Sequence, residues 1–399
     1  MKEGWKYMKL GEISESIKDG DWIEKKDQSL SGFRLIQTGN IGVGLFKNKA
    51  ESARYISEET FSRLHCEEVF EGDILISRLP DPVGRACIVP YLDTRNITAV
   101  DCSIVKLNSK IINSDYFLLY TQSNKYFNQI SSLCTGSTRQ RITRKKLTEL
   151  QIPVPPLPDQ QRIVSYLDAE FVKIEALKAN AEKQLQAAKD LFQAALKEML
   201  TPKEGWVEKK LKEVGKTQTG STPSKSNANY YGNYIPFIRP AELNFNNNGE
   251  IKYDSEVKLS ESGANCSRVI DENSVLMCCI GSIGKIGFTT LKVTCNQQIN
   301  TITPCSDYNA RFIYYALLSP DFQEEAIKIA NSARATLAII SKGKWENIFI
   351  PIPPRKEQQR IADRLDALSA NVKALQTNYA ETITLCNDLK QALLKKVFG

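Results

Sequence analysis

Apolar residues recur with a helical period in two long stretches of the chain, residues 159–200 and 357–399. In each stretch a row of apolar residues returns every seventh position and a second row follows four positions later, which is the spacing of a coiled-coil seam. Neither stretch has a proline or an internal glycine, and each begins with an acid, Asp159 or Glu357, that favours a helix start. The pattern predicts two helices of about 40 residues. The predicted seam residues are Leu167, Phe171, Ile174, Ala181, Leu185, Ala188 and Phe192 in the first helix and Leu365, Val372, Tyr379, Ile383, Cys386 and Leu393 in the second.

A helix of about 40 residues is about 60 Å long, which is more than one small domain can cover. We therefore expect the two helices to form an antiparallel coiled coil aligned about its midpoint. That register places Ala188 near Tyr379 and Ala181 near Cys386, so that small side chains face larger ones. It also leaves one globular domain at each end and gives the chain a pseudo-twofold symmetry. Alternatively, each helix packs on its own domain or on another chain.

The chain contains an internal repeat of about 200 residues, a feature that decides how the rest is interpreted. The segment Ile152 to Ala169 returns as Ile350 to Ala367 at an offset of 198, with eleven of eighteen residues identical. The repeat starts also match, at Glu3 to Ile13 and Glu204 to Val214. We therefore predict globular domains at 1–150 and 204–348, followed by proline-rich segments with long helices at 151–203 and 349–399. The middles of the two copies have diverged, which indicates either one frame with two specificities or drift of unconstrained surface.

The two globular segments alternate short β-branched or aromatic runs, such as 73–77 and 275–280, with Gly, Asn and Pro. Helical patterns cover 114–131 and 310–330, each after a strand-like run. The expected fold class is α+β, with two repeated globular domains separated by the two long helices.

Composition excludes several classes of protein. With 42% hydrophobic and 25% charged residues, the chain has the composition of an ordinary globular protein. No apolar run is long enough to cross a membrane, and the N-terminus lacks the apolar region of a secretion signal, so we expect a cytoplasmic protein. The ten cysteines include no CxxC pair, and a metal site at His65 and Cys66 would need remote partners, so no metal is expected. The net charge of +7 mildly favours a polyanionic partner.

Catalytic motifs are not found. The sequence lacks a glycine-rich loop for a methyl donor and lacks an Asn or Asp followed by Pro-Pro and an aromatic residue. The GSIGK segment at 281–285 lacks the spacing of a phosphate-binding P-loop. Asp19, Asp21 and Glu24 could imitate nuclease acids, but adjacent charges on a predicted loop are more simply solvated surface. We expect a chain without catalytic residues.

Candidate nucleic-acid contacts come from basic and polar loops. Five of the eight residues 139–146 are basic, which suits phosphate contacts or a solvated loop. Arg85 and Lys285 each follow a glycine, so they are either phosphate contacts or parts of tight turns. Gln37 and Arg239 correspond across the repeat and would favour adenine and guanine respectively, unless they are ordinary surface residues. The full candidate set is Arg34, Gln37, Asn40, Arg78, Arg85, Thr138, Arg139, Arg141, Arg144, Lys145, Ser221, Thr222, Ser224, Lys225, Arg239, Lys285 and Arg334.

Two dissimilar domains, each followed by an IPxPPxxxQQRI segment and a long helix, resemble the specificity subunit of a type I restriction-modification system. The resemblance covers essentially the whole chain. The Thr-Gly-Ser turn at 135–137 and the GSIGK loop add to it. Neither motif is repeated in the other copy. The counterpart of Thr-Gly-Ser in the second copy is Asn-Ser-Ala at 331–333, and the counterpart of GSIGK in the first copy is Asp-Pro-Val-Gly-Arg at 81–85. These departures put individual contacts in doubt rather than the architecture.

The resemblance implies that each domain is a target recognition domain for one half of a split site in double-stranded DNA, while the helices act as spacer and docking surface. It also implies that the chain binds no cofactor. Two modification subunits would bind S-adenosylmethionine and methylate adenine, and restriction subunits would use ATP and magnesium. Three rival interpretations remain: a specificity subunit of a fused or orphan methyltransferase system, a self-sufficient enzyme with a disguised active site, and a coiled-coil adaptor that binds only proteins.

Overall fold

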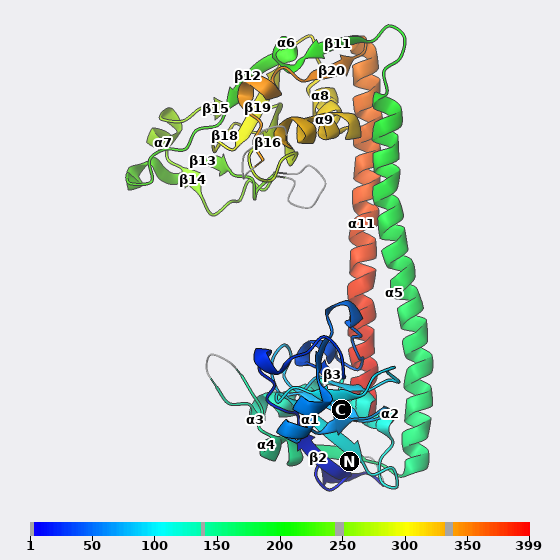
Figure 1. The fold of residues 1–399 in the computed structure, drawn as a ribbon. Helices are drawn as coiled ribbons and strands as arrows, with labels where there is room; N and C mark the ends of the chain where they lie inside the picture. Colours follow the sequence, from blue (N-terminus) through cyan, green and yellow to red (C-terminus); the bar gives the residue numbers. More distant parts are fainter. Residues whose placement is uncertain (1–3, 137–139, 244–250, 332–337) are drawn as a thin grey trace. The chain divides into compact units, whose positions relative to one another are not determined.

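The computed structural model describes residues 4–136, 140–243, 251–331 and 338–399. It divides into two compact units, one made of Met1–Asn180 with Thr382–Gly399 and the other of Ala181–Glu381. Each unit therefore combines one globular domain with a portion of each long helix (Figure 1).

The first unit is a mixed α+β structure. Its elements are β1 (Lys6–Lys9), β2 (Ser14–Asp19), η1 (Lys25–Asp27), β3 (Phe33–Ile36), η2 (Thr38–Asn40), η3 (Ala50–Ser52), β4 (Arg54–Ile56), α1 (Glu58–Leu64), β5 (Glu68–Val69), β6 (Ile74–Ser77), β7 (Ala86–Ile88), β8 (Asn96–Thr98), β9 (Cys102–Leu107), α2 (Ser114–Tyr120), α3 (Asn124–Leu133), α4 (Arg144–Thr148), β10 (Gln151–Val154) and the first part of α5 (Leu157–Leu200). One sheet has the order β2-β9-β6-β7, and another has the order β4-β3-β8-β5, in which β3 and β8 are parallel. A two-stranded antiparallel ladder joins β1 to β10, so the start of the repeat lies beside its proline-rich end.

The second unit repeats this topology. Its elements are β11 (Val207–Lys210), α6 (Leu211–Val214), β12 (Gly215–Thr219), η4 (Ala228–Tyr230), β13 (Tyr231–Ile238), β14 (Lys258–Leu259), α7 (Glu261–Asn265), β15 (Val269–Ile270), β16 (Ser274–Cys278), β17 (Ile286–Thr289), β18 (Val293–Cys295), β19 (Ile299–Pro304), α8 (Ala310–Leu318), α9 (Pro320–Asn331), α10 (Lys342–Trp345), β20 (Phe349–Ile352) and the first part of α11 (Arg355–Phe398). The sheets are ordered β12-β19-β16-β17 and β14-β13-β18-β15, with β13 parallel to β18, and β11 pairs with β20. The predicted class, two α+β domains each followed by a long helix, is confirmed.

The structure corrects one local prediction. The patterns at 114–131 and 310–330 each predicted one helix, whereas each region contains two. In the first copy the hydroxyl of Ser123 accepts a hydrogen bond from the Tyr126 backbone N–H and so caps a new helix. In the second copy α9 begins at Pro320, a residue that suits the first turn of a helix because it has no N–H.

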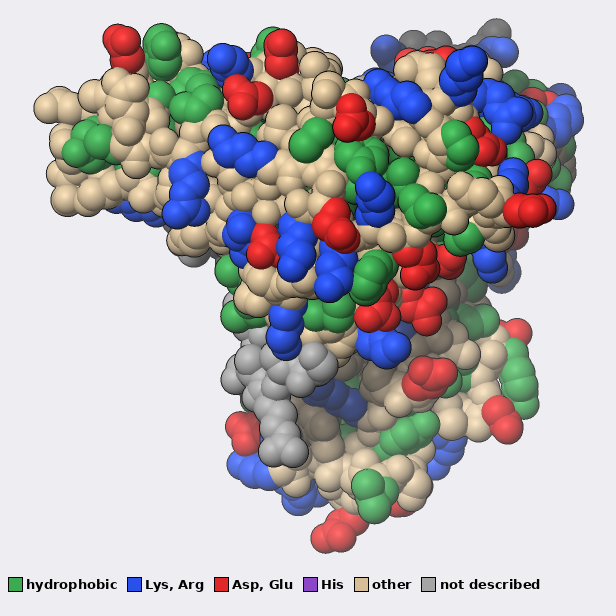
Figure 2. Space-filling view, turned by 90° about the horizontal axis from the view of Figure 1, so that it is seen from above, with side chains coloured by type: hydrophobic (Ala, Val, Ile, Leu, Met, Phe, Trp, Pro, Cys, Tyr) green, Lys and Arg blue, Asp and Glu red, His purple; other side chains and the backbone are tan. Residues whose placement is uncertain are grey.

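The surface mixes charges of both signs. On the face drawn in Figure 2, Lys and Arg side chains alternate with Asp and Glu over much of the visible surface. The positive net charge is therefore not gathered into one uniform patch on this face.

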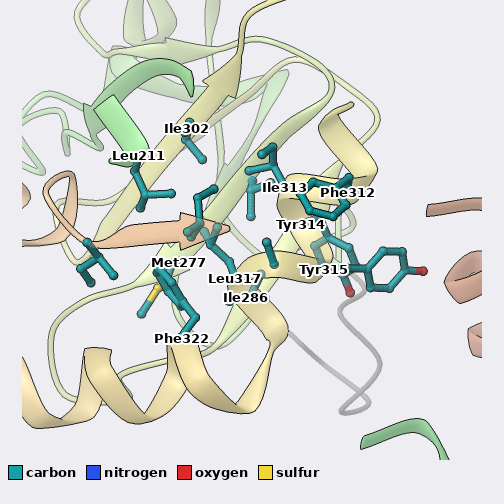
Figure 3. Packing of buried hydrophobic residues seen from close by; sticks show 14 of the residues in the cluster. Leu211, Met277, Ile286, Ile302, Phe312, Ile313, Tyr314, Tyr315, Leu317 and Phe322 are labelled. Atoms are coloured by element: carbon teal, nitrogen blue, oxygen red, sulfur yellow. The ribbon is translucent and has the colours of Figure 1, made fainter. Parts of the chain in front are cut away.

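Each unit has a core that includes the last turns of a long helix. In the second unit, Leu211, Met277 and Leu317 converge between β16 and the helix pair α8 and α9 (Figure 3). Leu196 and Leu200, from the end of α5, belong to the same core. In the first unit the equivalent places are taken by the end of α11, with buried side chains at Leu394, Val397 and Phe398.

The Gln-Gln-Arg-Ile segments form the joint between each domain and its helix. Gln160 is fully buried; its Oε1 accepts a hydrogen bond from the Asn113 backbone N–H at 2.7 Å, and its Nε2 donates to the Pro155 carbonyl at 2.8 Å. Gln358 makes the same two bonds with Asn309 and Pro353 at 2.8 and 2.9 Å. The residues that identify the repeat are therefore structural, because they fix where each long helix starts.

The long helices run antiparallel within each unit. In the first unit, Glu175 forms an ion pair with Lys390, and the Lys178 Nζ donates to the Asn387 Oδ1 at 3.3 Å. These contacts lie within two residues of the predicted register, in which positions 175 and 178 would face 392 and 389. In the second unit, the end of α5 shares a core with the start of α11. Most predicted seam residues are buried, namely Leu167, Ile174, Ala181, Ala188, Leu365, Val372 and Cys386. The others are half-buried, namely Phe171, Leu185, Phe192, Tyr379, Ile383 and Leu393.

Candidate nucleic-acid interface

A short turn after β3, residues 37–41, is held from inside the first domain. The Gln37 backbone N–H donates to the Asn40 Oδ1 at 2.9 Å, and the Asn40 Nδ2 donates to the Lys47 carbonyl at 2.9 Å. From the interior, the Arg85 Nη2 donates to the Thr38 carbonyl at 2.8 Å. Asn40 is buried and uses its side chain on its own chain, so it shapes the turn, whereas the half-buried Gln37 side chain remains available.

Arg85 is the clearest correction to the sequence-based set. It is only 7% exposed, and its guanidinium donates to four backbone carbonyls, those of Thr38, Ile41, Leu79 and Pro82. Burial also lowers the pKa of Arg85. The guanidinium thus donates inward through all three of its nitrogens and is buried, so Arg85 is part of the turn's support and not a surface phosphate contact.

Arg78 is also interior. It is 5% exposed; its Nη2 donates to the Val100 carbonyl, and its Nη1 lies 3.6 Å from the Asp19 carboxylate. The prediction that Arg78 contacts nucleic acid is therefore corrected in the same way as that for Arg85.

A pocket opens beside the turn of the first domain. It has a volume of about 270 Å³, and it is lined by Arg34, Leu35, Gln37, Thr38, Gly39, Asn40, Lys49, Ser52, Ala53 and Arg54. The structure thus brings together three residues that the sequence singled out, Arg34, Gln37 and Asn40. Sequence reasoning missed Arg54, which reaches this pocket through the pairing of β3 with β4, and Lys49, which precedes η3.

The second domain builds the same turn with different chemistry. The Arg239 backbone N–H donates to the Glu242 Oε2 at 2.9 Å, as Gln37 does to Asn40. The Arg239 side chain also binds Glu242, through Nε at 3.2 Å and Nη2 at 2.6 Å. This ion pair raises the pKa of Arg239 and orients its guanidinium while leaving Nη1 free of the carboxylate. Glu242, which is 4% exposed, was not foreseen as a functional residue.

The basic segment of the first domain is partly neutralised by its own domain. Arg141 lies 2.9 Å from Asp101, and Arg144 lies 3.9 Å from Asp19. Lys145 is exposed. The candidates Thr138, Arg139 and Arg334 lie outside the described residues.

The remaining candidates of the second domain divide into constrained and open side chains. The Ser221 hydroxyl accepts from the Arg268 backbone N–H at 2.9 Å, and the Thr222 hydroxyl donates to the Gln297 side chain. Ser224 is exposed and shares a hydrogen bond with Ser226. Lys225 is exposed, and Lys285 is half-exposed, unlike its buried counterpart Arg85.

Neither a metal-binding cluster nor a membrane-spanning helix occurs in the described ranges. Within them no group of three or more His, Cys, Asp or Glu side chains could hold a metal ion. In the same ranges no helix is both long and apolar enough to pass through a bilayer. The ten cysteines are free thiols, and burial raises the pKa of Cys87, Cys279 and Cys295 to about 12, so these three are poor nucleophiles.

The two domains thus share one α+β topology and differ in the polar residues of the equivalent turn. The family model described as type I restriction modification DNA specificity domain matches residues 2–187 and 203–385. The chain belongs to this family.

Named relatives agree with this assignment. The chain is 24% identical to the type I restriction enzyme HindI specificity subunit of Haemophilus influenzae, over 88% of this chain and 90% of the relative. It is also 24% identical to the EcoKI specificity subunit of Escherichia coli, over 100% of this chain and 89% of the relative.

Solved structures share the fold. A chain from a structural study of complex assembly in a type I R-M system superposes with a TM-score of 0.79 at 22% identity, covering 99% of this chain and 98% of that one. The HsdS subunit from Thermoanaerobacter tengcongensis gives 0.56 at 22% identity, covering 100% and 97%.

Proposed function

We propose that this chain is the DNA sequence-specificity subunit of a type I restriction-modification complex, in which each domain reads one half of a bipartite site. The observation that carries the proposal is the pair of equivalent turns, in which Gln37 and Asn40 are replaced by Arg239 and Glu242 on the same frame. Gln and Arg differ in the bases that they bind best, so two copies of one fold would read two different sequences.

The complex would divide its chemistry among several chains. The chain itself acts without a cofactor in the cytoplasm. Two modification subunits bind S-adenosylmethionine and methylate adenine, and restriction subunits use ATP and magnesium. Exposed apolar residues on the long helices favour protein docking there, because such side chains gain free energy when a partner covers them. They include Val172, Leu177, Leu191, Leu385 and Leu389, which are 49–70% exposed.

Replacing Arg239 with alanine should change the second half of the recognised site and leave the first half unchanged. The loss of one bidentate base contact costs about 1–3 kcal/mol of discrimination. The measurement is genome-wide modified-base sequencing in cells that carry the variant, the normal chain or neither.

Lys292→Ala is the matched control, because Lys292 is an exposed cation of the same domain whose ammonium lies 3.8 Å from Asp271. It should leave both halves intact. If the modified site is unchanged in the Arg239→Ala strain, Arg239 does not read a base. In a separate assay, methylation of DNA by the purified chain alone would favour the interpretation as a self-sufficient enzyme.

Inserting four residues into both α5 and α11 at matching points should lengthen the gap between the half-sites. Each helix gains about 6 Å, close to two base-pair steps of about 3.4 Å. The gap is read from the same modified-base maps. An insertion in α5 alone is the control: it shifts one helix against the other, breaks the seam and should abolish modification. Modification of the original gap by the double insertion would refute the spacer role.

A further inference from the structure

The pocket beside the turn of the first domain has an unusual charge distribution. Three cations line it, Arg34, Lys49 and Arg54, and no carboxylate does. Its volume of about 270 Å³ lies near the lower end for small-ligand sites, so it suits a group of the size of one nucleotide or less.

Arg34 is the residue that distinguishes this pocket. It is 6% exposed, and its Nη2 donates to the Asn48 Oδ1 at 2.7 Å. Across the described ranges no carboxylate lies within ion-pair distance of it. A buried guanidinium is stable only when its charge and its N–H groups are satisfied, and one amide oxygen satisfies a single N–H of the five. No nitrogen of Arg34 is among the buried, unpartnered atoms of the described residues, so its remaining N–H groups open into the pocket, where a bound anion would pair with them.

Three other buried or half-buried arginines are satisfied from within, whereas Arg78 keeps a buried Nε without a partner among the described residues. Arg85 donates to four carbonyls, Arg239 is bidentate with Glu242, and Arg311 is paired with Asp366. Compared with these arginines, Arg34 has one neutral partner, the Asn48 side chain. This difference points to an anion that another molecule supplies.

Lys49 covers the same pocket from its open side. A Cβ placed on Gly39 would come within 3.2 Å of the Lys49 Nζ, so the ammonium lies directly over the turn. Lys49 and Arg54 are both exposed; Lys49 precedes η3, and Arg54 is the first residue of β4. The pocket thus combines a fixed buried cation with two solvated cations, an arrangement that recognises a phosphate.

We infer that this pocket binds a phosphate group, and that in the working complex this is a backbone phosphodiester of DNA adjacent to the base that Gln37 faces. The inference rests on the proposed function.

The inference also predicts an asymmetry between the domains, because the position equivalent to Arg34 in the second copy, counted from Gln37 and Arg239, is Pro236. At this position the first domain therefore has a buried arginine and the second domain has a proline, with Lys258 opposite it on β14.

The test is the salt dependence of duplex DNA binding by the full chain. Each phosphate contact contributes about 0.9 to the slope of log affinity against log salt. Between 50 and 200 mM salt, the affinity of the unmodified chain should therefore fall about 3.5-fold more than that of Arg34→Gln. Lys49→Gln removes an exposed side chain and should give the same reduction without disturbing the interior.

Lys47→Gln is the matched control, because Lys47 is an exposed cation two residues from Lys49 that does not line the pocket. Its slope should equal that of the unmodified chain. If the salt slopes of Lys49→Gln and Arg34→Gln equal that of Lys47→Gln, the pocket does not bind a DNA phosphate, although the chain still binds DNA. A flat salt dependence of the unmodified chain overturns the proposed function together with the pocket.

Addition of inorganic phosphate distinguishes the two ligands that the pocket could hold, a phosphate of the DNA backbone or a free anion. If the pocket takes a DNA phosphodiester, millimolar phosphate competes weakly and all variants respond alike. If phosphate alone raises the thermal stability of the unmodified chain but not of Lys49→Gln, and the DNA slopes are equal, then the pocket holds a free anion and the assignment to the DNA backbone is wrong.

Discussion

Replacing Phe398 with alanine should destabilise the first unit by about 3–5 kcal/mol, the usual cost of removing a buried aromatic ring. Phe398 is 1% exposed and lies edge-on to Tyr116 and Tyr120, with ring centroids 5.5 and 5.4 Å away. The lost ring leaves a cavity in the core that α2 and the end of α11 share. Hydrogen exchange of the full chain should show faster exchange in residues 4–180 and unchanged protection in the second unit.

Leu200→Ala provides the matched experiment in the other copy. Leu200 ends α5 within the core of the second unit and is 5% exposed. Its loss should cost about 2–5 kcal/mol and accelerate exchange in the second unit only. The two variants should therefore weaken opposite halves of the DNA site in modified-base maps. Equal acceleration of both units by either variant would show that the ends of the helices do not belong to separate cores.

The long helices could be predicted from the sequence because their signal is local. Seventh-residue spacing of side chains such as Leu167 and Ile174 specifies which face of a helix is buried, whatever that face packs against. The duplicated Gln-Gln-Arg-Ile segments marked the helix starts to within two residues, since α5 begins at Leu157 and α11 at Arg355 rather than at Asp159 and Glu357. These segments matter because Gln160 forms hydrogen bonds with Asn113 and Pro155. The bond to Asn113 joins residues 47 positions apart, so the spacing of residues in the sequence does not reveal it.

The nucleic-acid candidates were less predictable, because their environment depends on contacts between distant strands. A basic residue after a glycine has the same pattern whether it faces solvent or the interior, and Arg85 and Lys285 share that pattern but differ in burial. Gly84 has a φ of +87°, and a Cβ there would meet Ile130 at 2.8 Å, so this glycine serves the tight turn. The pairing of Glu242 with Arg239 was within reach of the sequence, since an acid three residues after a turn arginine is a local feature.

Replacing Arg85 with methionine should destabilise the first domain by about 3 kcal/mol or more and abolish readout of the first half-site. Methionine fills a similar space but donates no hydrogen bond, so four carbonyls, two of them in buried hydrogen bonds and two in partly buried ones, lose a charged donor at once. Two of them, at Thr38 and Ile41, belong to the turn that carries Gln37. Urea unfolding followed by hydrogen exchange measures the first effect, and modified-base sequencing measures the second.

Lys285→Met is the control at the equivalent position of the second domain. The Lys285 side chain is half-exposed, so its replacement should cost less than about 0.5 kcal/mol and leave both halves of the site readable. Arg85→Lys should rescue little, because one ammonium cannot reach carbonyls on both sides of the turn as the guanidinium fork does. If Arg85→Met and Lys285→Met cost the same, the buried guanidinium does not support the turn, and the first half-site must be positioned by the bonds of Asn40 alone.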